Sequence, residues 1–132
     1  MFTTIIRPRV SETDGVGHIN NTTIPVWFEA GREGVFRIFT PDLSFKNWRC
    51  VLVNMNIDFV REVLLGKDVE VRTWIAKVGN SSFVLEEELY QDSHLCARGT
   101  ATYVNYNQAT RKAEPIPQEI REQLELHRRE PT

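Results

Sequence analysis

The apolar residues between positions 24 and 39 recur at spacings of three, four and seven, which is the period of one helix face. Thr22 or Thr23 can cap this helix, and Pro25 suits its first turn because the missing N–H has no partner there. Pro41 ends the pattern. Because much of the face is aromatic, the pattern predicts one long, buried helix. Its apolar positions are Ile24, Trp27, Phe28, Gly31, Val35, Ile38 and Phe39.

From residue 51 the period of the pattern changes to two. Val51 to Phe59 alternates apolar and polar residues, which predicts a strand with one wet face. Three more alternating stretches follow at residues 69–75, 83–89 and 95–103, separated by short breaks rich in Gly, Asn, Asp and Ser. Breaks this short imply antiparallel hairpins.

The two ends of the chain add one element each. Residues 2–10 have strand-like content, and Pro8 places that strand at an edge or an end because it lacks an N–H. Ile116, Ile120 and Leu124 recur at intervals of four, which predicts a short terminal helix. One apolar helix packed on one antiparallel sheet is an α+β architecture, and 132 residues form a single domain, residues 1–132.

Charge and cysteine content narrow the possible partners. Sixteen Lys and Arg residues against eighteen Asp and Glu give a net charge of −2, so we expect no nucleic-acid partner. Cys50 and Cys96 belong to no Cys or His cluster, which argues against a zinc site or a disulfide framework. Without a signal peptide or an apolar run of about 18 residues, we expect a cytoplasmic protein with no membrane partner.

The residues with the most chemistry lie just before the predicted helix. Asp14 and His18 supply a base or nucleophile and a hydrogen-bond donor, four positions apart. Gly15 and Gly17 let the backbone approach a ligand, and the first N–H groups of a helix suit a developing oxyanion. The same residue types are also typical of an ordinary turn and helix cap, so this stretch alone does not decide between the two readings.

Over a longer stretch the loop has a specific pattern that continues into the helix. It reads Thr13-Asp14-x-x-Gly17-His18-Ile19-Asn20-Asn21, followed by Trp27-Phe28-Glu29-Ala30-x-Arg32. This pattern resembles that of the 4-hydroxybenzoyl-CoA thioesterase family of hotdog-fold proteins. The resemblance implies an α+β hotdog fold, in which a curved antiparallel sheet wraps around one long central helix, with a short C-terminal helix.

The resemblance also implies a reaction, the hydrolysis of an acyl-CoA thioester without a metal or redox cofactor. Asp14 matches the family's catalytic carboxylate, as nucleophile or as the base that activates water. Backbone N–H groups near Asn20 and Asn21 would bind the carbonyl oxygen, His18 would orient the loop or donate a hydrogen bond, and Gly17 would admit the substrate. A thiolate, with a pKa of roughly 8.5, leaves without a strong general acid.

Residues outside the loop are weaker candidates. Ser81 and Ser82 follow Gly79-Asn80 and face the acyl group or the CoA arm in one reading, and are ordinary turn residues in the other. Arg111 and Lys112 meet the CoA phosphates or are simply solvated.

Glu29 is a second candidate carboxylate on the central helix. Its other interpretation is an ion pair with Arg32, three residues along the same helix. Family members often have Tyr where this chain has Ile24, and the following Pro25 is unusual, so the acyl pocket is expected to differ in shape and polarity.

Two other functions are compatible with the loop. Asp14 and His18 also suit a hotdog hydratase or dehydratase acting on an acyl thioester. A noncatalytic acyl-CoA-binding module is the second alternative. The resemblance to the thioesterase family also implies a homodimer with a continuous sheet and sites at the subunit interface, or a homotetramer.

Overall fold

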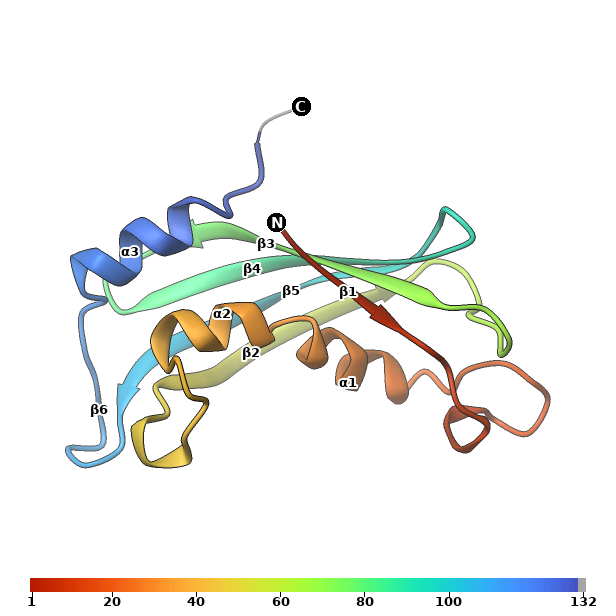
Figure 1. The fold of residues 1–132 in the computed structure, drawn as a ribbon, viewed down its shortest axis with the longest axis horizontal. Coiled ribbons are helices and arrows are strands. Elements are labelled where there is room, and N and C mark those ends of the chain that lie inside the picture. The colour runs from red at the N-terminus through yellow and green to blue at the C-terminus, as the bar shows by residue number, and fades with distance from the viewer. Residues whose placement is uncertain (131–132) are drawn as a thin grey trace.

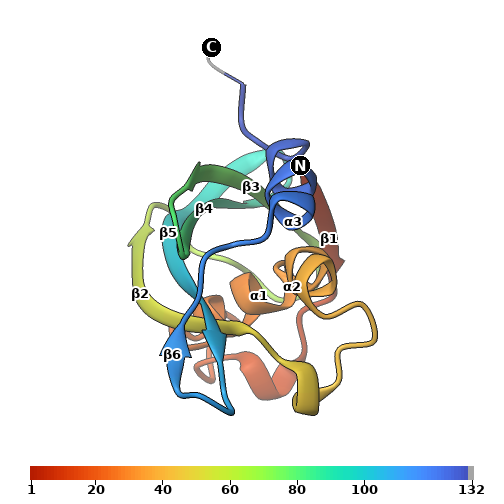
Figure 2. The same ribbon diagram turned by 90° about the vertical axis from the view of Figure 1, so that its left-hand side faces the viewer.

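A six-stranded antiparallel sheet curls around a helical segment that lies against its concave face (Figure 1). The computed structural model describes residues 1–130. The sheet order is β1-β3-β4-β5-β2, with β6 paired to the end of β5. The end-on view in Figure 2 shows how strongly the sheet is curved. The strands are β1 (Phe2–Ile6), β2 (Cys50–Phe59), β3 (Val69–Val78), β4 (Ser82–Gln91), β5 (His94–Asn107) and β6 (Lys112–Ala113).

This arrangement confirms the predicted α+β hotdog fold. The hairpins at Gly79-Asn80 and Asp92-Ser93 are present, and the terminal helix α3 spans Gln118–Glu125. The first strand ends earlier than expected and is followed by a 3-10 turn, η1 (Val10–Glu12); a second such turn, η2 (Phe45–Asn47), precedes β2. Among the described residues, no helix is long and apolar enough to cross a bilayer.

The central helix is divided where the sequence predicted one continuous element. It forms α1 (Thr23–Ala30) and α2 (Glu33–Phe39), with Gly31 and Arg32 between them. Gly31 lies so close to β3 that a Cβ there would come within 2.6 Å of Val71 Cγ1. The Thr73 hydroxyl also donates a hydrogen bond to the Gly31 carbonyl at 3.1 Å. The break therefore sits where the helical segment makes its closest approach to the sheet.

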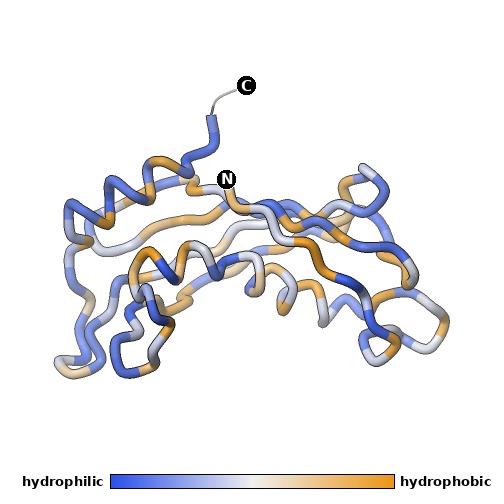
Figure 3. The backbone as a smooth tube through the Cα atoms, viewed as in Figure 1, coloured by the Kyte–Doolittle hydropathy of each residue, from blue (hydrophilic) through white to orange (hydrophobic). Residues whose placement is uncertain are grey.

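The core consists of two apolar clusters with a polar row between them. The buried polar residues of that row on the sheet are Thr73 of β3 and Glu87 of β4, which are direct neighbours across the sheet. One cluster packs under α2 and α3, and the other packs under α1 and the loop before it. In Figure 3 apolar positions recur along the helices and along the strands of the sheet.

Strand β2 differs from its prediction, because its apolar side chains are exposed. The alternation along β2 predicted one wet face, yet in a single chain nearly the whole strand is accessible. The reason is topological: β2 is the last strand of the sheet, and α1 and α2 cover mainly β3, β4 and β5. The exposed apolar residues of this strand are Val51, Leu52, Val53, Met55 and Phe59.

Candidate active site

Asp14 lies in a tight loop, residues 13–19, that directly precedes α1; we call it the Asp14 loop. Its ends are paired by a bridge between Thr13 and Ile19, and the Asp14 N–H donates to the His18 carbonyl at 2.9 Å. The two glycines of the loop have φ values of +95° and +87°, which only glycine adopts easily. The loop therefore holds an exposed carboxylate on a fixed backbone.

The Asp14 carboxylate is partly held and partly free. Its Oδ1 accepts a hydrogen bond from the Val16 N–H at 3.1 Å. Within residues 1–130, Oδ2 has no hydrogen-bond partner. One oxygen thus fixes the side-chain orientation, and the other faces the surroundings, where it can act on a water molecule or a carbonyl carbon.

Hydrogen bonds on two sides hold the Asp14 loop and the residue before it to the rest of the molecule. The segment after β2 pairs with it, through Ile19 N–H to Val63 O at 2.8 Å and Leu65 N–H to Gly17 O at 2.9 Å. On the other side, the Glu12 carboxylate accepts a hydrogen bond from the Trp27 indole N–H at 3.0 Å. Glu12 was not singled out from the sequence, because nothing in its spacing marks a partner fifteen residues away.

Glu12 also carries a perturbed charge. Burial raises the pKa of this carboxyl, but hydrogen bonds from Arg9 and Trp27 outweigh burial and hold the pKa below its ordinary value. Glu12 is therefore an ionised anchor between the loop and α1.

The start of α1 presents backbone donors next to this loop. The Asn20 N–H is already occupied, since it donates to the Glu12 carbonyl at 2.8 Å. The Asn20 side-chain oxygen accepts from both the N–H and the hydroxyl of Thr22, at 3.0 Å each. Asn20 therefore shapes the turn, and the N–H of exposed Asn21 is the better placed of the two candidate oxyanion donors.

The His18 ring points to the carboxylate of Glu62 and not to that of Asp14. Its Nε2 lies 3.4 Å from Glu62 Oε2, and its ring is partly exposed. Its link to Asp14 runs through the backbone carbonyl that receives the Asp14 N–H.

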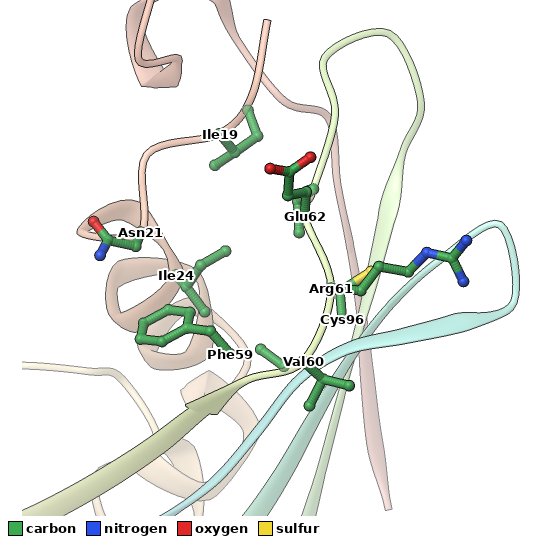
Figure 4. Close-up of a pocket in the computed structure, with 10 residues that line it drawn as sticks. Ile19, Asn21, Ile24, Phe59, Val60, Arg61, Glu62 and Cys96 are labelled. Atoms are coloured by element: carbon green, nitrogen blue, oxygen red, sulfur yellow. The ribbon is translucent and has the colours of Figure 1, made fainter.

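A cavity of about 370 Å³ adjoins the Asp14 loop. Figure 4 shows Ile24 of α1 beside Phe59 at the end of β2, with Ile19 and Glu62 on the loop side. Asn21 also lines this cavity, which is mainly apolar. The sequence candidates Asp14, Gly17, His18, Asn20 and Asn21 thus share one end of the molecule.

Arg32 does not pair with Glu29, as one interpretation of the sequence held. Its guanidinium instead enters the polar row of the core, where its Nε and Nη2 bond the two oxygens of Glu87, the latter at 3.1 Å. Its Nη1 donates to the Tyr103 hydroxyl at 3.0 Å. Arg32 and Glu87 are each 1% exposed. Burial raises the pKa of the Glu87 carboxyl, and the bonds from Arg32 counteract that rise.

Glu29 instead faces a second, larger hollow of about 720 Å³ between the helical segment and β2. Its far wall is the segment between α2 and β2. Four aromatic side chains give the hollow a largely apolar surface, and we call this hollow the aromatic groove. Its lining includes Val26, Glu29, Phe36, Phe45, Trp48 and Tyr103.

The remaining sequence candidates lie at the opposite end of the sheet from the Asp14 loop. They cluster beside the Cys50 end of β2. There Asn105 of β5 pairs with Cys50, and the Asn105 N–H donates a hydrogen bond to the carbonyl of Ser81. The Asp14 loop contacts the segment after the Phe59 end, about 30 Å away along a ten-residue strand. One chain does not bring the two groups together. These candidates are Ser81, Ser82, Arg111 and Lys112.

Known proteins resemble this chain in sequence and in fold. The family model for the thioesterase-like superfamily matches residues 8–124. A predicted thioesterase from Bacillus stearothermophilus has 55% sequence identity and a TM-score of 0.96, and the match covers 99% of this chain and 98% of that chain. A thioesterase from Thermus thermophilus, solved with coenzyme A and Zn, has 26% identity and a TM-score of 0.84, and the match covers 93% and 96% of the two chains.

A curated relative from a plant is longer. The chloroplastic acyl-(acyl-carrier-protein) hydrolase FATB2 of Cuphea viscosissima is 32% identical over 91 residues, which is 67% of this chain and 22% of that protein. The chain thus spans about a fifth of the length of that relative. Together, these similarities support thioester hydrolysis as the class of reaction.

Proposed function

This chain belongs to the thioesterase-like superfamily, and on that premise we propose that it hydrolyses an acyl-CoA thioester to a free carboxylic acid and CoA. The observation that carries the proposal is the exposed Asp14 carboxylate, fixed by one oxygen in a tight loop directly before α1. Within the superfamily we assign the chain to the 4-hydroxybenzoyl-CoA thioesterase family, on the pattern from Thr13 to Arg32.

The proposed chemistry needs a source of oxygen and a donor for the oxyanion. Asp14 either takes a proton from water, whose oxygen then attacks the carbonyl carbon, or attacks that carbon itself to form an anhydride that water opens. The Asn21 N–H stabilises the oxyanion, a contribution typically worth about 10²–10³ in rate. The C–S bond then breaks and CoA leaves as the thiolate, so the reaction requires no metal or redox cofactor.

We propose that the site is completed by a second copy of this chain. β2 is a ten-residue edge strand with apolar side chains exposed along it, the kind of edge that invites pairing with another strand. Two copies related by a two-fold axis pair their β2 strands antiparallel, which extends the sheet across both chains. A homodimer forms in this way, and two dimers give a homotetramer.

The antiparallel pairing has a geometric consequence for the site. The Phe59 end of one β2 lies beside the Cys50 end of the other. The Asp14 loop of one chain therefore faces the aromatic groove and the cluster formed by Ser81, Ser82, Arg111 and Lys112 of its partner. In this arrangement Arg111 and Lys112 contact the CoA phosphates.

The proposal also covers the partners of the protein and its location in the cell. The acidic net charge supports a protein that acts without a nucleic-acid partner, and the lack of an apolar run of about 18 residues supports one without a membrane partner. The cytoplasmic location stays a prediction from the sequence.

Thiol release from a panel of acyl-CoA esters tests the function. Asp14→Asn should reduce turnover about 10²-fold or more at unchanged thermal stability. Asp42→Asn is the matched control, because Asp42 is also exposed and also accepts the N–H two residues along, from Ser44 at 3.0 Å. Full activity in Asp14→Asn would refute the assignment.

The same panel separates the other candidate activities. Reversible hydration of an enoyl-CoA without thiol release would identify a hydratase. Saturable binding without turnover would identify a binding module. Thiol release only from acyl-carrier-protein esters would show that the substrate is an acyl-carrier-protein thioester, the substrate class in the name of the plant relative.

A further inference from the structure

We propose that the aromatic groove binds the acyl group of the substrate, and that Glu29 makes the groove selective for acyl groups without a negative charge. This inference rests on the proposed function and goes further, because it names the substrate class and a specificity-determining residue. The groove has a volume of about 720 Å³, which falls in the range of small-molecule sites.

The walls of the groove suit an apolar acyl group. Phe36 and Trp48 have ring centroids 5.1 Å apart, and Phe36 also meets the edge of Tyr103 at 5.5 Å. Phe45 stands 85% exposed at the mouth, 6.3 Å from Trp48. Phe36 and Tyr103 are 9% and 3% exposed, so the accessible aromatic surface comes mainly from Phe45 and half-buried Trp48, and an apolar ligand that covers it is favoured.

The floor of the groove is held rigid from below. The Tyr103 hydroxyl accepts the bond from Arg32, which is itself fixed by both oxygens of Glu87. Tyr103 also stacks on Phe83 with ring centroids 5.6 Å apart. An acyl group in the groove therefore meets a surface that is ordered before binding.

The charge at the groove is negative. Glu29 and Glu33 both line it from the helix side. Glu33 lies 3.6 Å from Arg37, whereas Glu29 has no cationic side chain within 4 Å among residues 1–130. The charge of Glu29 also acts on the Tyr103 hydroxyl, whose pKa is raised by burial and further by that charge. A second carboxylate inside the groove would be repelled without compensation.

The test compares two six-carbon esters that differ only at the far end, hexanoyl-CoA and adipyl-CoA. The protein should prefer hexanoyl-CoA in kcat/KM, and Glu29→Gln should shift the ratio toward adipyl-CoA by about 10- to 100-fold. Glu33→Gln is the matched control, because that carboxylate is already paired, and should shift the ratio much less. An unchanged ratio in Glu29→Gln, alongside normal hydrolysis, would overturn the inference and leave the proposed function standing.

A second variant tests the place of binding. Ala30 is exposed on the groove side of α1, so Ala30→Phe fills the groove without disturbing the core. Hydrolysis of hexanoyl-CoA should fall at least tenfold while that of acetyl-CoA is retained. If the variant instead breaks the dimer and leaves the preference for acyl length intact, the partner chain fills the groove and the inference is wrong.

A binding measurement keeps the inference separate from turnover. The thioethers S-hexyl-CoA and S-(5-carboxypentyl)-CoA cannot be hydrolysed, and calorimetry measures their affinities directly. If no ester is hydrolysed, the proposed function fails, but tighter binding of the hexyl compound that Glu29→Gln equalises would still support the groove. Equal binding of both compounds by the natural chain would refute it.

Discussion

Replacing one partner of the buried ion pair Arg32–Glu87 should destabilise the protein far more than replacing both. Glu87→Leu leaves a guanidinium that is 1% exposed without its carboxylate, and Arg32→Met leaves the carboxyl without its two donors and Tyr103 without one. Removing one partner of such a pair typically costs about 3–5 kcal/mol of unfolding free energy, because a buried charge stays uncompensated.

The double variant Arg32→Met/Glu87→Leu should cost only about 1 kcal/mol, since apolar residues of similar volume often replace a buried pair with little loss. For a domain of this size, each single change should lower Tm by about 10–20 °C. Because burial raises the pKa of Glu87 and favours its uncharged form, Arg32→Met should lose less stability in acid than at pH 8.

Urea unfolding followed by circular dichroism gives the four free energies of this cycle. The uncompensated charge in each single variant implies a coupling energy of several kcal/mol between positions 32 and 87. Single variants that each lose less than about 1 kcal/mol, or a double variant that loses the sum of both, would refute it.

Burial raises the pKa of the Cys50 thiol to about 12, so iodoacetamide at pH 8 should leave this thiol unmodified in the folded protein and alkylate it after unfolding. Mass spectrometry measures the modification, and rapid labelling of Cys50 in the native state would contradict the prediction. Because the folded pKa of Glu12 is lowered, its stabilisation is present above about pH 4.5 and is lost as pH falls through the lowered pKa, so Glu12→Gln should flatten the acid limb of stability in thermal melts. An equally steep limb in the variant would rule that out. Gly99→Ala should destabilise the sheet by more than about 1 kcal/mol, since its Cβ would collide with the Asn56 carbonyl oxygen. An unchanged Tm would contradict this and show that β2 shifts to accommodate the methyl group. Dialysis against EDTA should leave thiol release intact, and lost activity that Zn²⁺ restores would count against the metal-free reaction.

The sequence predicted the fold because local periodicity and topology agree along most of the chain. Strands β3 and β4 bury alternate residues, and the turn residues between them lie where expected. The division of the central helix was missed because Gly31 and Gly34 were only a mild local signal against a continuous helix, and the close approach of Gly31 to β3 cannot be seen in the sequence. The exposure of β2 was missed because the alternation of apolar residues does not say what covers them.

The site could be predicted in part. The loop around Asp14 was found because its residues are contiguous, and contiguous residues stay together in any fold. The partner of Arg32 lies 55 positions away, which spacing cannot reveal. One signal was available: Glu87 falls in phase with Leu85 and Leu89 on the buried face of β4, and a charged residue in that phase needs a buried partner.

The polar row across the sheet divides the molecule into two units of stability. Strands β1 to β5 each contribute residues to both apolar clusters, and between the clusters lies the buried ion pair of Arg32 and Glu87. Clusters separated in this way open with different free energies, which native-state hydrogen exchange would record as two classes of amides. The half under α1 can then loosen around the Asp14 loop to admit substrate and release product, while the half under α2 and α3 keeps the chain folded.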